Sequence, residues 1–575
     1  MARQLDQIQR LRLMKKINLL IILLLVTPLL SQDVKRKIKI KDRYLNFPVS
    51  ASQERKTMTI EVGGEKLREF FIRLSDGDPD YWVFYDMSNI DSKKLTLKFP
   101  EKRSGFKKIY QSEKFAGEDS LYKETRRPQF HFSSRRGWNN DPNGLAYYNG
   151  EYHLYYQHNP YEIEWGNMHW GHAVSKDLVH WEELGIKLYP DDFGDMWSGC
   201  AVVDHNNTSG FQTGEDPPLV AIYSAWKSLG YGDSHQTNHL AYSNDNGRTL
   251  TKYDGNPVVD SKAQWGPNTR DPKVFWHEPI KKWVMTLYER NGNSIYHSDD
   301  LKNWKHISHL EGFYECPELF ELPIDGDVNN TKWVTYGASG IYVLGDFDGY
   351  KFKPDTRKLK YTDGALWAAQ TYDNIPKSDG RRIQFAWGVD IDHGGTMPFG
   401  QLILLPTELT LKSTPNGIRM YSTPIEELDK LHKKTHSWSN IEIHKRSKDP
   451  KTTEADINKE LKRIEGDLFR IKAKVELISG NHFQIIFNGN IIADHGLDKN
   501  DINGAFYENY DSESRTVELD IFVDRTSVEV FVDGGAFSTA HPLEDAQNSN
   551  GLEVYGHIHY NIKSLEVIEL NSIWQ

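Results

Sequence analysis

The chain has 575 residues, more than one ordinary domain holds, so two or three domains are expected. Its net charge is −11 and no basic block follows the N-terminus, which argues against nucleic acid as a partner. Aromatic residues make up 12% of the chain, and because their faces stack on sugar rings as well as packing cores, the composition mildly favours a carbohydrate ligand.

The N-terminus is typical of a secretory signal. Four basic residues precede an apolar run, Leu19 to Val26, that is too short to span a bilayer as a stable helix. Residues 1–32 are therefore predicted to be a signal peptide, with Met14 as an alternative start. The mature chain is expected to be secreted or periplasmic, with no membrane span. The two cysteines, Cys200 and Cys316, are too few for a disulfide scaffold and are expected to be free thiols that pack.

Short alternating runs follow the signal. Met58, Ile60 and Val62 alternate with polar residues and are followed by Gly63-Gly64, a pair that suits a hairpin turn. The sequence thus predicts a small β-rich N-terminal module over residues 33–125.

A loosely repeated pattern runs from Phe130 to about Leu411. Each copy opens with an aromatic-rich strand, and four copies add a second strand after a polar turn. The first strands of the five copies start at Glu151, Leu219, Lys282, Lys332 and Arg382. Repeats of this length that contain only strands indicate propeller blades, so residues 126–411 are predicted to form a five-bladed β-propeller. A β-sandwich with coincidental turns is the alternative.

The last part of the chain alternates with period two. In the run Val517 to Val523 every second residue is apolar, and Gly534-Gly535 marks a turn soon afterwards. This pattern predicts an antiparallel C-terminal β-sandwich over residues 436–575. A linker over 412–435, with a short helix in Pro424 to Lys434, is expected to join it to the propeller. The predicted fold class is all-β.

Three carboxylates stand where strands of the propeller are predicted to start. Asp141 lies among the turn formers of Trp-Asn-Asn-Asp-Pro-Asn-Gly, Asp271 in Arg-Asp-Pro and Glu315 in Glu-Cys-Pro. Because the innermost strands of a propeller line a central funnel, residues at their leading ends converge. Taken singly, each acid suits a turn or a salt bridge. Together they match the nucleophile, the general acid and the stabiliser that glycoside hydrolysis requires.

These motifs resemble those of glycoside hydrolase family 32, the β-fructofuranosidases, which include levanases, inulinases and invertases. Trp138 to Gly144 resembles the family block W-M-N-D-P-N-G, with Asn139 where Met is usual, and the Arg-Asp-Pro and Glu-Cys-Pro triplets match two further blocks. Trp197 to Val202 resembles F-S-G-S-A-V, with Cys200 in place of Ser. The resemblance runs from about Phe130 to the C-terminus. The N-terminal module resembles extensions on fructanases of Bacteroidetes-type bacteria.

The resemblance implies a role for each acid. Asp141 is the implied nucleophile, Glu315 the general acid and base, and Asp271 the transition-state stabiliser of a retaining double displacement on terminal β-D-fructofuranosyl residues. The implied substrate-binding residues are Trp138, Asn139, Asn140, Gln157, Trp165, Trp197, Ser198, Arg270 and Trp367. Tryptophans that crowd the floor of a funnel favour exo-action at chain ends.

The expected partner is a fructan polysaccharide or fructo-oligosaccharide, with levan, inulin and sucrose all open as substrates and the oligomeric state open too. A fructosyltransferase on the same scaffold and a non-catalytic fructan-binding propeller are the alternatives, and retention of all three acids argues against the second. No cofactor and no metal are expected, since the histidines around His169 lack HExxH spacing and the acidic residues near Asp191 suit a solvated loop.

Overall fold

The computed structural model describes residues 33–230, 232–260, 262, 266–394, 396–448, 451–496, 501–507, 515–545 and 550–574. The predicted signal peptide, residues 1–32, lies outside the described residues. In the described part nearly all regular structure is β-strand, which confirms the all-β prediction. No helix there is long and apolar enough to cross a membrane. The chain divides into two compact units, Met1–Ala116 and Gly117–Gln575.

The first unit holds two small antiparallel sheets, in the orders β1-β6-β3-β4 and β5-β2-β7. Gly63 and Gly64 join β3 to β4 with φ of +65° and +98°, a left-handed backbone that glycine adopts without strain, so the predicted hairpin is confirmed. The elements are β1 (Val34–Lys39), β2 (Tyr44–Val49), β3 (Lys56–Val62), β4 (Glu65–Ile72), β5 (Tyr81–Asp86), β6 (Lys94–Phe99), α2 (Ser104–Lys108) and β7 (Tyr110–Ser112).

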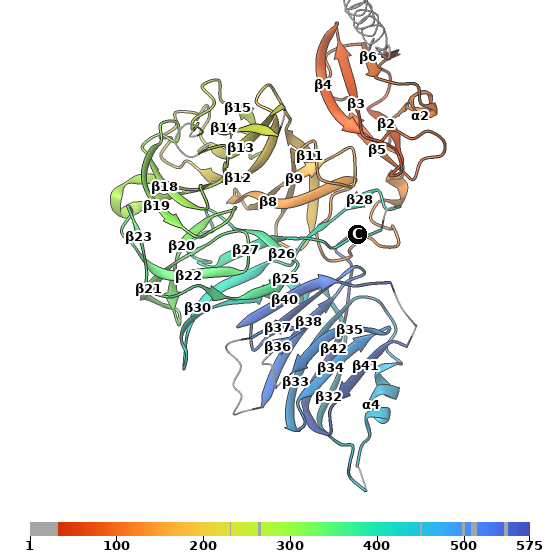
Figure 1. Ribbon diagram of the computed structural model, residues 1–575, viewed down its shortest axis with the longest axis vertical. Helices are drawn as coiled ribbons and strands as arrows, with labels where there is room; N and C mark the ends of the chain where they lie inside the picture. The colour runs from red at the N-terminus through yellow and green to blue at the C-terminus, as the bar shows by residue number, and fades with distance from the viewer. Residues whose placement is uncertain are drawn as a thin grey trace, which may run out of the picture. The chain divides into compact units, whose positions relative to one another are not determined.

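The second unit begins with three sheets, each built on consecutive strands that pair antiparallel (Figure 1). β28 (Phe399–Gly400) adds to β8 in parallel, so a late strand closes on the first sheet. The sheets comprise β8 (Gly137–Tyr148), β9 (Glu151–Asn159), β10 (His169–Ser175) and β11 (Trp181–Leu188); β12 (Asp195–Val203), β13 (Leu219–Gly230), β14 (Asp233–Ser243) and β15 (Thr251–Lys252); β16 (Thr269–His277), β17 (Lys282–Glu289), β18 (Gly292–Ser298) and β19 (Lys305–Glu311). Their first strands adjoin one another, β8 against β12 and β12 against β16.

The following strands share one ten-stranded sheet, where two separate blades were expected. A single parallel pair, Ile324 with Leu411, joins β20 to β30 and so merges the two ladders. The strands are β20 (Glu318–Ile324), β21 (Asp327–Tyr336), β22 (Ile341–Phe347), β23 (Phe352–Pro354), β24 (Leu359–Lys360), β26 (Leu366–Thr371), β27 (Arg382–Gly388), β29 (Leu402–Ile403), β30 (Thr407–Thr414) and β31 (Gly417–Pro424). Within the expected linker 412–435, β31 pairs with β30, and η3 (Glu426–Leu431) is a short 3₁₀ helix.

The C-terminal strands form two sheets around one apolar core, in the orders β25-β40-β39-β38-β33-β42-β32 and β37-β36-β35-β34-β41. Val517, Leu519, Ile521 and Val523 are buried on one face, as their alternation predicts. Phe522 on the opposite face is buried too and belongs to another apolar core. The strands are β25 (Thr362–Gly364), β32 (His432–His444), β33 (Phe469–Ser479), β34 (His482–Phe487), β35 (Asn490–Gly496), β36 (Asp501–Ile502), β37 (Ala505–Phe506), β38 (Thr516–Val523), β39 (Ser527–Val532), β40 (Phe537–Pro542), β41 (Leu552–Gly556) and β42 (His559–Leu570), with one helix, α4 (Glu454–Leu461).

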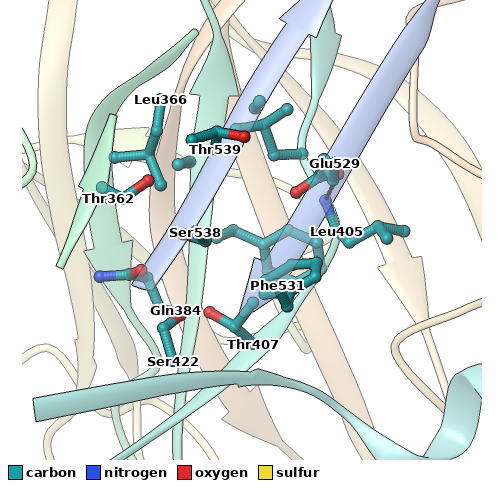
Figure 2. Close-up of a pocket in the computed structure, with 14 residues that line it drawn as sticks. Thr362, Leu366, Gln384, Leu405, Thr407, Ser422, Glu529, Phe531, Ser538 and Thr539 are labelled. Atoms are coloured by element: carbon teal, nitrogen blue, oxygen red, sulfur yellow. Dashed lines mark hydrogen bonds between the residues drawn. The ribbon is translucent and has the colours of Figure 1, made fainter. Parts of the chain in front are cut away.

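The C-terminal sheets are tied to the preceding strands by pairing and by a buried ion cluster. β25 pairs with β40 in parallel. Near this contact His131 lies fully buried between two carboxylates, with Nδ1 2.8 Å from Asp524 and Nε2 2.7 Å from Glu529. Figure 2 shows a cavity at the junction, lined by Gln384 and Thr407 of the preceding strands and by residues of β39 and β40. None of the three candidate acids lines this cavity.

Candidate active site

Two of the candidate acids lie on β-bulges inside strands. The pairing of β8 with β9 shifts between Asn139 and Pro142, which leaves Asp141 on the bulge. The pairing of β16 with β17 shifts in the same way around Asp271, whose φ is +62°. The sequence prediction placed both acids before their strands. In the structure, strand pairing starts before each acid, and the turn-forming residues form a bulge within the strand. A bulge changes the direction of a side chain without ending the strand.

The third acid precedes its strand, as predicted. Glu315 lies three residues before β20, and both it and Cys316 have positive φ, +49° and +40°. This backbone packs closely on Gly337, where a Cβ atom would lie 2.7 Å from the carbonyl oxygen of Tyr314. A glycine is therefore needed opposite the loop that presents Glu315.

Asp141 is surrounded by donors. Its Oδ2 accepts hydrogen bonds from Ser198 Oγ at 2.5 Å and from Gln157 Nε2 at 3.3 Å, and its Oδ1 accepts one from Asn140 Nδ2 at 3.1 Å. Burial raises the pKa of Asp141 above its ordinary value, and the negative charge of Glu315 adds to this rise. The donors from Ser198 and Asn140 act against the rise because they stabilise the ionised carboxylate.

Cys316 joins two of the acids. Its Sγ lies 3.7 Å from Oδ2 of Asp141 and 3.7 Å from Oδ2 of Asp271, and its backbone N–H donates to Asp271 at 3.2 Å. Burial raises the pKa of Asp271, and the neighbouring carboxylates Glu315 and Asp141 raise it further. The role expected for Cys316 was packing, and the clue to its contact with the acids was its place inside Glu-Cys-Pro. Both cysteines are free, and Cys200 is buried as expected.

Arg270 connects the third acid to this pair. Its Nη2 donates a hydrogen bond to Glu315 Oε1, and its Nε lies 3.7 Å from Oδ2 of Asp271. The guanidinium also lies over three aromatic rings, those of Tyr288 at 4.8 Å, Tyr314 at 5.8 Å and Trp197 at 5.9 Å. The structure therefore gathers all three predicted acids around one arginine and one thiol.

The predicted tryptophans reach this cluster to different degrees. Trp138 donates from Nε1 to Asn140 Oδ1 at 2.9 Å, which places its ring beside the neighbour of Asp141. Trp197, next to Ser198, meets Trp165 edge to face at 6.0 Å. Trp367 pairs across its ladder with Trp387, whose ring contacts Trp138 at 5.9 Å. Sequence reasoning missed Trp387, although it lies in one of the repeated aromatic strands.

Asn139 is a predicted site residue whose side chain lies away from the acids. Its side chain is fully buried, and its Oδ1 accepts a hydrogen bond from the backbone of Ser134 at 3.2 Å. The bulge turns Asp141 toward the cluster while Asn139, two positions earlier, points into the body of the unit. Among the described residues no group of three or more His, Cys, Asp or Glu side chains is placed to hold a metal ion.

Comparison with known proteins places the chain in a family. Residues 131–424 match the model of the glycosyl hydrolases family 32 N-terminal domain, and residues 427–569 match that of the family 32 C-terminal domain. The chain belongs to glycosyl hydrolases family 32. It is 40% identical over 497 residues to a levanase of Bacillus subtilis, an alignment that covers 80% of this chain and 72% of the levanase.

Two further comparisons support the family assignment. An extracellular exo-inulinase of Aspergillus niger is 34% identical over 486 residues, covering 73% of this chain and 89% of the relative. The crystal structure of exo-inulinase from Aspergillus awamori superposes with a TM-score of 0.66 and 29% identity, covering 79% of this chain and all of that one.

Replacing Ser198 in this family 32 chain should move the acidic limb of its pH–rate profile. In the role of nucleophile that the sequence predicts for it, Asp141 must be ionised. The Ser198 hydrogen bond favours the ionised form, so Ser198→Ala should raise the pKa of Asp141 further. We expect the acidic limb of kcat/KM to shift upward by about one pH unit. Ser294→Ala removes a buried hydroxyl that bonds His309 instead and serves as the control. An unshifted limb in Ser198→Ala would contradict this role.

Proposed function

We propose that the protein is a secreted glycoside hydrolase that releases terminal β-D-fructofuranosyl units from fructans. The observation that carries the proposal is the meeting of Asp141 and Asp271 at the Cys316 thiol, with Glu315 held beside them by Arg270. The names of the relatives, a levanase and exo-inulinases, support fructans as the substrate class. A predicted signal peptide and the extracellular exo-inulinases support secretion.

The proposed reaction is a double displacement with retention. A carboxylate oxygen of Asp141 attacks C2 of the terminal fructosyl unit while the bond from C2 to the leaving oxygen breaks, and Glu315 gives its proton to that oxygen. Glu315 then takes a proton from water, whose oxygen attacks C2 and releases Asp141. Two inversions at C2 leave the product with the configuration of the substrate.

The remaining residues bind and orient the substrate in this proposal. Asp271, which shares the Cys316 thiol with Asp141, would bind ring hydroxyls and stabilise the developing positive charge. Gln157 and Ser198 hold the nucleophile in place. Trp138, fixed by its hydrogen bond to Asn140, would form one wall of the fructose pocket.

The proposal extends to the architecture of the second unit and to the position at which a fructan chain is cleaved. The three separate sheets and the merged sheet that follows would be the five blades of a propeller, followed by a β-sandwich. The unit boundary at Ala116 and the limits of the matched family domains favour domains that end near residues 116 and 424. Exo-action is proposed because Trp138 bonds the neighbour of Asp141, and Trp165 packs on Trp197 beside Ser198, an arrangement that favours a pocket for a chain end.

Replacing the proposed acid should give a loss that depends on the leaving group. Glu315→Gln cannot donate a proton, so fructan hydrolysis should fall by about 10² to 10⁴-fold. An aryl β-D-fructofuranoside has a good leaving group and should lose much less. Initial rates on both substrates measure the difference. Equal losses on the two would remove Glu315 from the role of acid.

Chromatography of the products from levan, inulin and sucrose over time tests the function as a whole. From levan and inulin, free fructose should appear first and alone, whereas sucrose should give fructose and glucose in equal amounts. The three rates give the linkage preference. A ladder of oligosaccharides in early digests would show endo-action, and chain growth at high sucrose would identify a fructosyltransferase. Release of no sugar from any of the three would leave a binding protein.

A further inference from the structure

One aromatic ring next to the acid cluster is left half uncovered. Tyr314 directly precedes Glu315 and is 50% exposed. Its side chain is not among the residues that the family motifs point to, and the reaction proposed above leaves it without a role. The sugar that departs in that reaction, however, has to be bound by some part of the site.

The ring of Tyr314 is nevertheless held in place. Tyr288 meets it edge to face, with 5.3 Å between ring centroids and 73° between planes, and the Arg270 guanidinium lies 5.8 Å from its centroid. Its backbone carbonyl accepts a hydrogen bond from Ala338 at 2.9 Å and packs on Gly337. A ring that is fixed on one side and exposed on the other offers a ready surface for the C–H face of a sugar.

The position of Tyr314 selects which sugar it binds. The proton of Glu315 goes to the oxygen between the terminal fructose and the next unit, so that next unit must lie beside Glu315 as it leaves. Tyr314 and Arg270 both adjoin Glu315, one with an aromatic face and the other with guanidinium N–H donors for hydroxyl groups.

We propose that Tyr314 is the stacking platform for the sugar unit that follows the terminal fructose, and that it sets the preference for chains over small fructosides. This inference rests on the proposed function, in which Glu315 protonates the leaving oxygen. Tyr314 is a specificity-determining residue in this account, since it touches the leaving group and not the atoms that react.

The test compares fructosides that differ only on the leaving-group side. Methyl β-D-fructofuranoside has no sugar there, whereas 1-kestose and 6-kestose carry a second fructose that is itself linked to glucose. In Tyr314→Ala the kcat/KM for the better kestose should fall roughly tenfold more than that for the methyl fructoside, mainly through KM. Tyr314→Phe keeps the ring and should restore the wild-type ratio between the two substrates.

A matched control is available elsewhere in the unit. Tyr350 is 49% exposed and meets His297 edge to face at 5.1 Å, so Tyr350→Ala removes a comparable ring away from the acids and should leave the ratio unchanged. The proposed role of Tyr314 would be contradicted if Tyr314→Ala lowered kcat/KM equally for the kestose and the methyl fructoside. It would also be contradicted if Tyr314→Phe did not restore the wild-type ratio of these two kcat/KM values. Wild-type protein that cleaves neither substrate would instead overturn the proposed function, so the two failures are distinguishable.

Discussion

Asp141→Asn should abolish hydrolysis of fructosides while the protein stays folded. Asparagine keeps the shape of the side chain and an oxygen that accepts the Ser198 hydrogen bond, but its amide cannot attack C2. We expect kcat/KM to fall on the order of 10³ to 10⁵-fold. Rates on a fructan and on an aryl fructoside should fall together, because both reactions need the nucleophile.

The control for this variant is a matched change of an exposed acid. Asp299 pairs with Lys282 at the surface, and Asp299→Asn should leave activity near that of the wild type. Melting curves of Asp141→Asn and wild type should superpose. Retention of more than a few per cent of wild-type activity, with an unchanged melting curve, would remove Asp141 from the role of nucleophile.

His131→Leu should destabilise the second unit strongly. His131 is fully buried and contacts both Asp524 and Glu529, so leucine would leave two buried carboxylates without their cation. Breaking a buried ion cluster in this way costs about 3–5 kcal/mol of unfolding free energy. Denaturant unfolding at neutral pH measures the change. His235→Leu removes an exposed ion pair with Asp260 and should cost about 0–1 kcal/mol.

The effect of His131 should also depend on pH. Burial lowers the pKa of His131, but the hydrogen bonds to Asp524 and Glu529 outweigh burial and raise it from 6.5 to about 9. A histidine whose pKa is raised on folding stabilises fully below its unfolded pKa and loses this contribution as pH rises through the folded value. The difference between wild type and His131→Leu should therefore be largest below about pH 6.5 and shrink toward pH 9. Equal stability of the two proteins at neutral pH would contradict the ion cluster.

Local pattern predicted much of the fold. Alternation over Val517 to Val523 predicted one buried face of β38 but not the burial of Phe522 on the other, and Gly63-Gly64 marked a hairpin. The bulges under Asp141 and Asp271 were not predicted, because the same turn-forming residues serve a turn between strands and a bulge within one. The position of the Asn139 side chain away from the acids was not predicted for the same reason, since a bulge changes the side to which each residue points.

The similar positions of the three acids relative to strands made their grouping predictable. The hydrogen-bond partners of each acid were not predictable. Glu315 lies 45 residues from Arg270 and 174 from Asp141 (315 − 141), and no local pattern encodes which donor meets which carboxylate. The contact of His131 with Asp524 spans 393 residues and depends on how two sheets pack. One parallel pair, Ile324 with Leu411, merged two expected blades, and a single pair leaves no periodic signal.

Mass spectrometry of a trapped intermediate tests the account most directly. In Glu315→Gln, an aryl β-D-fructofuranoside should still fructosylate the nucleophile, while attack by water is slow because no base activates it. After an acid quench and peptic digestion, the peptide that contains Asp141 should carry one fructosyl unit. The corresponding peptide of the Asp141→Asn variant should carry none. A fructosyl unit on the peptide that contains Asp271, or no labelled peptide although the aryl group is released in turnover, would contradict the account.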